Sequence, residues 1–132
     1  MHAQCQCGLL SAEVSASSGA ISACHCFDCQ RRSGSPFGVI AYFEAGQVAL
    51  DGEATTYTRL TDSGATFTTG FCATCGSTVW ARADKHPSMI GVPVGAFADW
   101  SFPPPMRSVF EASRHSWVEM PSDIPRFPRG RN

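Results

Sequence analysis

Seven cysteines in three short clusters constrain this chain of 132 residues more than any other feature. The clusters are Cys5-Gln6-Cys7-Gly8, Cys24-His25-Cys26-Phe27-Asp28-Cys29 and Cys72-Ala73-Thr74-Cys75-Gly76. An odd number of thiols cannot all pair as disulfides, and thiols stay reduced inside cells. Metal binding is therefore the leading use for these cysteines.

Composition and charge exclude several classes of protein. With 43% hydrophobic and 16% charged residues the chain is typical of a globular protein, and its length suits a single domain over residues 1–132. A formal net charge of −1 gives no electrostatic signal for nucleic acid or for an anionic membrane. The first residues do not form a secretory signal, and no stretch reaches about 18 apolar residues. We expect a cytoplasmic protein with small-molecule or protein partners, and the sequence leaves a homo-oligomer open.

Short apolar stretches separated by turn signals predict an antiparallel β architecture. Strands are expected at residues 9–14, 20–24, 36–43, 48–50, 54–58, 65–69, 78–81 and 89–94. The first two are expected to form a hairpin, and the last is expected at a sheet edge because it contains Gly91 and Pro93. Prolines from Pro103 onward predict an extended Pro-rich tail, anchored by Phe110, Trp117 and Phe127. His2 is expected to be disordered.

The first and third clusters share a pattern, because each places a glycine, Gly8 or Gly76, directly after its second cysteine. A glycine can adopt a positive φ, which lets backbone amides point at sulfur as in a zinc knuckle. Two such turns joined by one ion would make a structural zinc site with the ligands Cys5, Cys7, Cys72 and Cys75. The alternative is four separate thiols, each buried or free.

The second cluster then supplies an open set of three ligands, Cys24, Cys26 and Cys29. On an extended backbone Cys24 and Cys26 share one face and His25 points away, so His25 is not expected to be a ligand. The residues that follow predict a helical turn ending at Gly34. A zinc ion with three protein ligands keeps one coordination position for water or substrate, as catalytic sites do. A structural site completed by an unidentified residue, or an inactive open site, remains the alternative.

Two arginines follow the second cluster, separated from it by Gln30. Arg31 and Arg32 would offset the negative charge of three thiolates or hold a substrate carboxylate. The alternative is a solvated surface pair.

The motifs, in this order and spacing, resemble the glutathione-dependent formaldehyde-activating (GFA) enzyme family, also called the centromere protein V (CENP-V) family. The resemblance extends from about Cys5 to Trp117. It rests on Cys-x-Cys-Gly, Cys-His-Cys-x-x-Cys-x-Arg-Arg-Ser-Gly-Ser-Pro-Phe and Phe-Cys-x-x-Cys-Gly-Ser. It implies an all-β fold, a small zinc-stabilised β-tent (Mss4-like) of antiparallel sheets. It also implies two zinc ions per chain, a structural one at Cys5, Cys7, Cys72 and Cys75 and a catalytic one at Cys24, Cys26 and Cys29.

The same resemblance implies a carbon–sulfur lyase that acts on the adduct of a small carbonyl compound and a thiol, with glutathione and a small aldehyde as partners. Zinc at an open site can bind an incoming thiol or polarise an aldehyde oxygen. The residues alone leave a second class open, a zinc-stabilised binding module without catalysis. The absence of an eighth cysteine favours the enzyme, because a binding module has no need of an unsaturated zinc ion.

Overall fold

The computed structural model describes residues 1–17 and 19–131. The structure is mostly β, with a single α-helix in the part of the chain that is described, which confirms the predicted fold class. Two compact units are present, one made of Met1–Gly19 and Ala41–Trp100 and the other of Ala20–Ile40 and Ser101–Asn132. Strand β4 (Gly38–Glu44) carries the chain from the second unit into the first.

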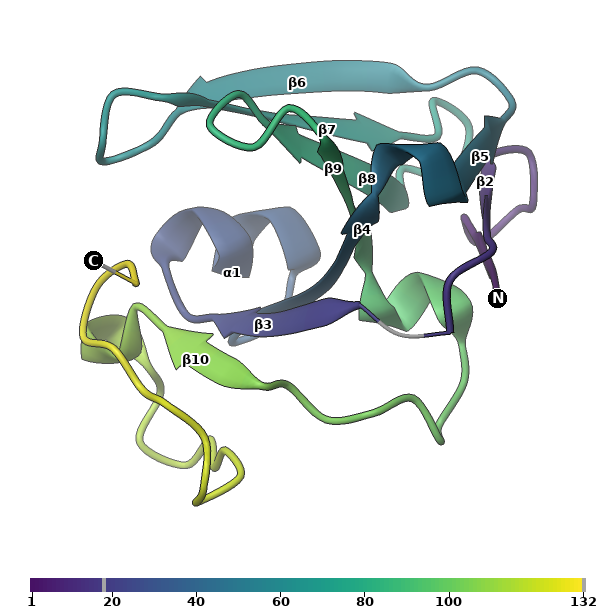
Figure 1. Cartoon of the computed structure of the whole chain (residues 1–132). Helices are drawn as coiled ribbons and strands as arrows, with labels where there is room; N and C mark the ends of the chain where they lie inside the picture. The colour runs from purple at the N-terminus through teal and green to yellow at the C-terminus, as the bar shows by residue number, and fades with distance from the viewer. Residues whose placement is uncertain (18, 132) are drawn as a thin grey trace. The chain divides into compact units, whose positions relative to one another are not determined.

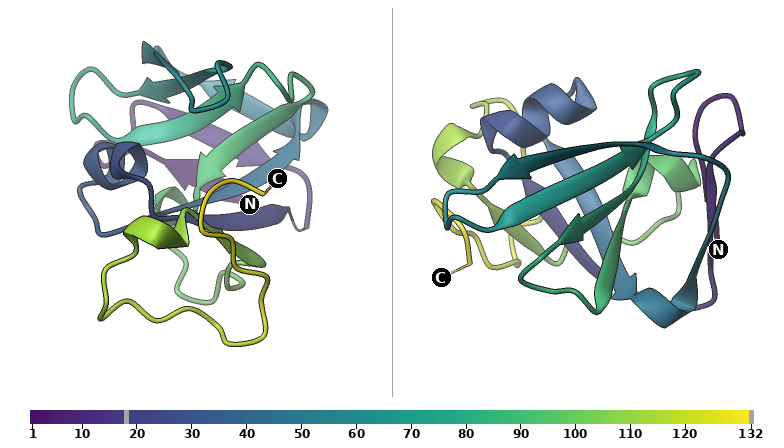
Figure 2. Two further views of the ribbon diagram at one scale, coloured as in Figure 1. Left: turned by 90° about the vertical axis from the view of Figure 1, so that its left-hand side faces the viewer. Right: turned by 90° about the horizontal axis from the view of Figure 1, so that it is seen from above.

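The first unit contains two sets of antiparallel strands (Figures 1 and 2). The smaller set forms a sheet in the order β1-β2-β5, with β1 (His2–Gln4), β2 (Ser11–Val14) and β5 (Val48–Asp51). The larger set runs β9-β8-β7-β6, with β6 (Thr55–Leu60), β7 (Thr66–Phe71), β8 (Thr78–Ala83) and β9 (Met89–Pro93). Two 3₁₀ turns, η1 (Ala45–Gln47) and η2 (Val94–Phe97), complete this unit.

Alternation of small apolar and polar residues explains these strands. In β2 the side chains of Ala12 and Val14 are buried while Glu13 between them is exposed, the period-two pattern of a half-buried strand. The same unit buries Phe43, whose ring packs edge-on against Phe97 with the centroids 6.3 Å apart. Buried apolar side chains of this kind form the core of the first unit.

The second unit carries the only α-helix among the described residues. It contains β3 (Ala20–Cys24), α1 (Phe27–Ser33), β10 (Arg107–Val109) and the 3₁₀ turn η3 (Glu111–Ser113). Helix α1 ends at Gly34, whose φ of 67° is left-handed, as the sequence predicts for a helix stop. Strand β10 lies beside β3 in Figure 1 and pairs with it in parallel, so the antiparallel expectation does not hold for this pair.

Three expectations about individual strands are wrong. Strand β2 pairs with β1 and β5, and it forms no hairpin with β3. Strand β9 has a neighbouring strand on each side, so it does not lie at an edge. Its Pro93 is the last residue of the strand, and Gly91 pairs with Ala81 of β8. His2 lies in β1, where its Nδ1 is 2.6 Å from Glu13 Oε1.

Backbone hydrogen bonds hold the C-terminal segment, and two of the three expected anchors, Phe110 and Phe127, are half-buried. The amides of Phe110 and Glu111 donate to the carbonyl oxygens of Arg129 and Phe127, and the Phe127 amide donates to Ser108 O. Trp117, expected as an anchor, leaves 70% of its surface exposed. Within the described residues, no helix is long and apolar enough to cross a membrane.

Candidate metal centres

Two tight turns in the first unit bring together Cys5, Cys7, Cys72 and Cys75, and the turns are built alike. The Gly8 amide donates to Cys5 O and the Gly76 amide to Cys72 O. In each turn the first cysteine's amide donates to the carbonyl five residues later, Leu10 in one and Ser77 in the other. The φ values of Gly8 and Gly76 are 84° and 79°, in the left-handed region that glycine favours. The knuckle geometry expected from the sequence is thus present at both places.

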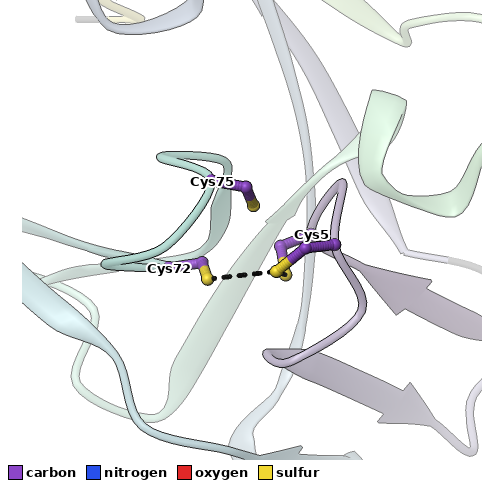
Figure 3. Close-up of side chains that lie close together, drawn as sticks. Cys5, Cys72 and Cys75 are labelled. Atoms are coloured by element: carbon purple, nitrogen blue, oxygen red, sulfur yellow. Dashed lines mark hydrogen bonds between the residues drawn. The ribbon is translucent and has the colours of Figure 1, made fainter.

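The four sulfur atoms of these turns all lie within 4.8 Å of one another. In Figure 3 the side chains of Cys5, Cys72 and Cys75 turn their sulfurs toward one another from the two turns. The Sγ of Cys7 is 3.7 Å from that of Cys5 and 3.6 Å from that of Cys72. Tetrahedral zinc with Zn–S bonds of about 2.3 Å places its sulfur ligands about 3.8 Å apart. The residues present therefore fit a four-cysteine zinc site.

Hydrogen bonding prepares part of this first site for a cation. Hydrogen bonds with Ser77 lower the pKa of the Cys75 thiol to about 5. The hydroxyl of Ser77 has the largest effect, and its backbone amide has the next largest. The Leu10 amide donates to Cys5 Sγ at 3.2 Å and the Thr74 amide to Cys72 Sγ at 3.4 Å. Amide donors of this kind stabilise the thiolate, which is the form of cysteine that binds metal.

The second unit brings together Cys24, Cys26 and Cys29, whose sulfurs also lie within 4.8 Å of one another. Cys24 ends β3, Cys26 is the N-cap of α1, and Cys29 lies in the first turn of that helix. The Cys26 sulfur accepts a hydrogen bond from the Cys29 amide at 3.3 Å. Among the residues described, no histidine, acidic residue or further cysteine joins this set, which leaves it with three ligands.

Crowding disfavours loss of the Cys24 and Cys29 protons when no cation is present. Hydrogen bonds with Cys26 and Cys29, together with burial, raise the pKa of Cys24 far above its ordinary value. The hydrogen bond with Cys24 lowers the pKa of Cys29, but Cys26 and burial outweigh it and the balance is upward. A divalent cation can replace these protons, and its binding then stabilises the three thiolates.

The comparison with known families decides where the chain belongs. Residues 1–119 match the model of the family described as glutathione-dependent formaldehyde-activating enzyme. The chain belongs to this family. A solved structure of a Rhodobacter sphaeroides protein is similar to this GFA-family chain, with a TM-score of 0.60 and 22% sequence identity. The similarity covers 96% of this chain and 99% of that protein, and it shows a shared fold. No curated protein matches the sequence.

The GFA-family chain keeps its two arginines in different surroundings. The guanidinium of Arg31 lies 6.0 Å from the ring centroid of Phe27, which is itself 62% exposed. Arg32 instead reaches over Gly38, where a Cβ atom would stand 2.5 Å from Arg32 Nη2 and 3.6 Å from Cys29 Cβ. The Arg32 charge also acts on Cys29 in the direction that favours its thiolate. Arg32 is thus the arginine nearer to the three-cysteine set.

His25 is completely buried and takes no part in either cysteine set. Its Nε2 is 2.9 Å from Ser108 Oγ and 3.3 Å from Glu111 Oε2, and the Ser108 hydroxyl donates to the same carboxylate oxygen. Burial lowers the pKa of His25, although Glu111 acts in the opposite direction. Sequence reasoning missed Ser108 and Glu111, since no local signal connects His25 to residues 83 and more positions away.

Proposed function

We propose that the chain is a zinc-dependent carbon–sulfur lyase of the glutathione-dependent formaldehyde-activating type. Its substrate would be an adduct of a thiol and a small carbonyl compound, of the S-hydroxymethylglutathione kind. The observation that carries the proposal is the second cysteine set. Its three thiols converge, and no fourth protein ligand joins them among residues 1–17 and 19–131, which is the arrangement of a zinc site open to substrate. Membership of the family supports the same reaction class.

The two cysteine sets would have separate roles. Cys5, Cys7, Cys72 and Cys75 would hold a structural zinc ion that ties the start of the chain to the turn after β7. Cys24, Cys26 and Cys29 would hold the catalytic zinc ion. When bound there, zinc supplies a site for a thiol sulfur and a Lewis acid for a carbonyl oxygen.

In the lyase direction, the carbon–sulfur bond of HO–CH₂–S–R breaks and its electron pair goes to sulfur. The hydroxyl loses its proton as the carbonyl double bond forms, and the thiol gains a proton overall. The products are formaldehyde and the free thiol, so the reaction needs no oxidant or reductant. A thiol pool of this kind is reduced in the cytoplasm, which is where we place the activity.

Arg31 and Arg32 are the proposed contacts for substrate carboxylates, such as those of glutathione. Arg32 has the stronger support, since its guanidinium packs over Gly38 beside Cys29. Arginine binds carboxylates through two parallel N–H donors, which gives both affinity and orientation. Arg31 precedes Arg32 in the same helix, and its guanidinium lies over the exposed ring of Phe27.

Metal analysis and thiol binding together test the proposal. The wild-type chain should contain two zinc ions, and Cys26→Ser should lose one of them while remaining folded. Glutathione should bind to the wild type in calorimetry, S-methylglutathione should bind much more weakly, and exchange of formaldehyde with glutathione should be faster than in buffer. Equal binding of the two compounds, or no acceleration by a protein with two zinc ions, would instead favour a zinc-stabilised binding module.

A further inference from the structure

We infer that Gln30 and Ser113 are positioning residues for the second cysteine set, acting through the backbone carbonyl of His25 that lies between Cys24 and Cys26. The inference rests on the proposed zinc site at these cysteines. It assigns a role to the C-terminal segment around η3, which contributes no metal ligand.

The carbonyl oxygen of His25 accepts two side-chain hydrogen bonds. Gln30 Nε2 donates to it at 2.9 Å from helix α1, and Ser113 Oγ donates at 2.7 Å from η3. The amide of His25 donates in turn to Val109 O at 3.1 Å. Both polar groups of this backbone residue are therefore held by partners from the C-terminal segment or the helix.

The side chain of Gln30 is itself fixed at both ends. Its Nε2 also donates to the Ser113 carbonyl oxygen at 3.3 Å, and its Oε1 lies 3.2 Å from His115 Nε2. Because Oε1 can only accept a hydrogen bond, it faces the N–H of His115, and Nε2 of the same amide group then faces the two carbonyl oxygens. Gln30, Ser113 and His115 thus form a clasp on the peptide group that leads from His25 into Cys26.

This peptide group sets the direction of the Cys26 side chain relative to Cys24. Three thiolates repel one another. A site with three ligands also has one metal–sulfur bond fewer than a site with four, so its metal affinity depends more on ligands that the protein holds in place before the metal binds. Groups that orient metal ligands from outside the coordination sphere typically contribute about 10-fold to 100-fold in metal affinity. We therefore assign the clasp to zinc retention at the second site, with no effect on the first site.

The two sites of one molecule provide the test, since the first site serves as an internal control. The variants Ser113→Ala and Gln30→Met remove the donors to His25 O, whereas Ser113→Thr keeps the hydroxyl. Ser15→Ala is the matched control, because the Ser15 hydroxyl is exposed and makes only a 3.4 Å contact with Gln47 O in the first unit. Zinc affinity is measured by competition with a chromophoric chelator, and the thiolate–metal absorption of the cobalt-substituted protein reports the ligand geometry.

Ser113→Ala and Gln30→Met should each weaken the second site about 10-fold or more and change its cobalt absorption, while the first site keeps its affinity. Ser113→Thr and Ser15→Ala should behave like the wild type. Unchanged affinity at the second site, or loss of zinc from both sites together, overturns the inference. A wild type with one zinc site would overturn the proposed function as well, whereas the expected zinc result without lyase activity would overturn the proposed function alone.

Discussion

The indole ring of Trp80 occupies the space that a side chain at Gly70 would need. The two residues face each other across β7 and β8, and a Cβ atom at Gly70 would lie 2.0 Å from Trp80 Cε2. The pairing of the two strands shifts register directly after Gly70, and Cys72 follows two residues later. The close approach of Trp80 to Gly70 and the register shift thus lie directly before the second knuckle.

Replacing Gly70 with alanine should destabilise the protein by about 1–3 kcal/mol, because a rigid ring and a strand backbone must both move to admit the methyl group. Urea unfolding of the zinc-loaded protein measures this loss. Gly46→Ala is the control, since nothing lies within 4 Å of its added Cβ and its φ is not left-handed. Equal midpoints for the two variants would mean that the contact with Trp80 does not constrain β7.

Removal of a ligand should affect stability very differently at the two cysteine sets. Cys72→Ser should lower the free energy of unfolding by more than about 3 kcal/mol, since structural zinc contributes roughly 10–16 kcal/mol in small peptide systems. Cys26→Ser should cost much less, because its set belongs to one short helix and the end of one strand. Thermal unfolding with and without added zinc measures both. A larger loss for Cys26→Ser would contradict the division into structural and catalytic sites.

Arg32 should contribute more than Arg31 to the binding of anionic thiols, because its guanidinium lies beside Cys29. Arg32→Gln is expected to weaken binding of 3-mercaptopropionate about 10-fold, the value of one charge-assisted hydrogen bond, and to leave 2-mercaptoethanol unaffected. Arg31→Gln, on the same helix, should have a smaller effect, and both variants should retain two zinc ions. If the two variants bind both thiols equally, neither arginine recognises a substrate carboxylate.

Glu111 should be important for the stability of the second unit. Its carboxylate lies 3.3 Å from Arg114 Nε and 3.6 Å from Arg126 Nη1, besides its contacts with Ser108 and His25. Its side chain is only 14% exposed, so Glu111→Gln should cost about 1–3 kcal/mol. Chemical denaturation compares this variant with Glu119→Gln, which alters an exposed carboxylate. A cost equal to that of the control would show that the network adds no stability.

Local chemistry made the cysteine turns and the helix stop predictable from sequence. A glycine after the second cysteine of a knuckle predicts a residue with left-handed φ, and Gly8 and Gly76 both adopt that conformation. Gly34 ends α1 for the same reason. The division of the seven cysteines into one set of four and one set of three followed from this pattern. The structure brings the members of each set together. Their roles as structural and catalytic zinc sites stay predictions.

Partners distant in sequence were not predictable in the same way. A period-two pattern shows which face of β2 is buried, but it does not show which strand lies beside it, so the hairpin with β3 was a wrong choice among open pairings. The parallel pairing of β10 with β3 joins residues more than 80 positions apart. The contacts of His25 with Ser108 and Glu111 depend on that pairing, and they could not be seen before it was known.

The sulfur of Cys26 both caps helix α1 and faces the other two thiols of its set. A chemical change at this one atom, whether coordination, alkylation or oxidation, therefore alters the hydrogen bond that the Cys29 amide donates to it. The nitrogen-15 chemical shift and the hydrogen-exchange rate of that single amide would therefore report the state of the site in solution. The Cys29 amide thus reports occupancy of the site without substrate and without chemical modification of any cysteine.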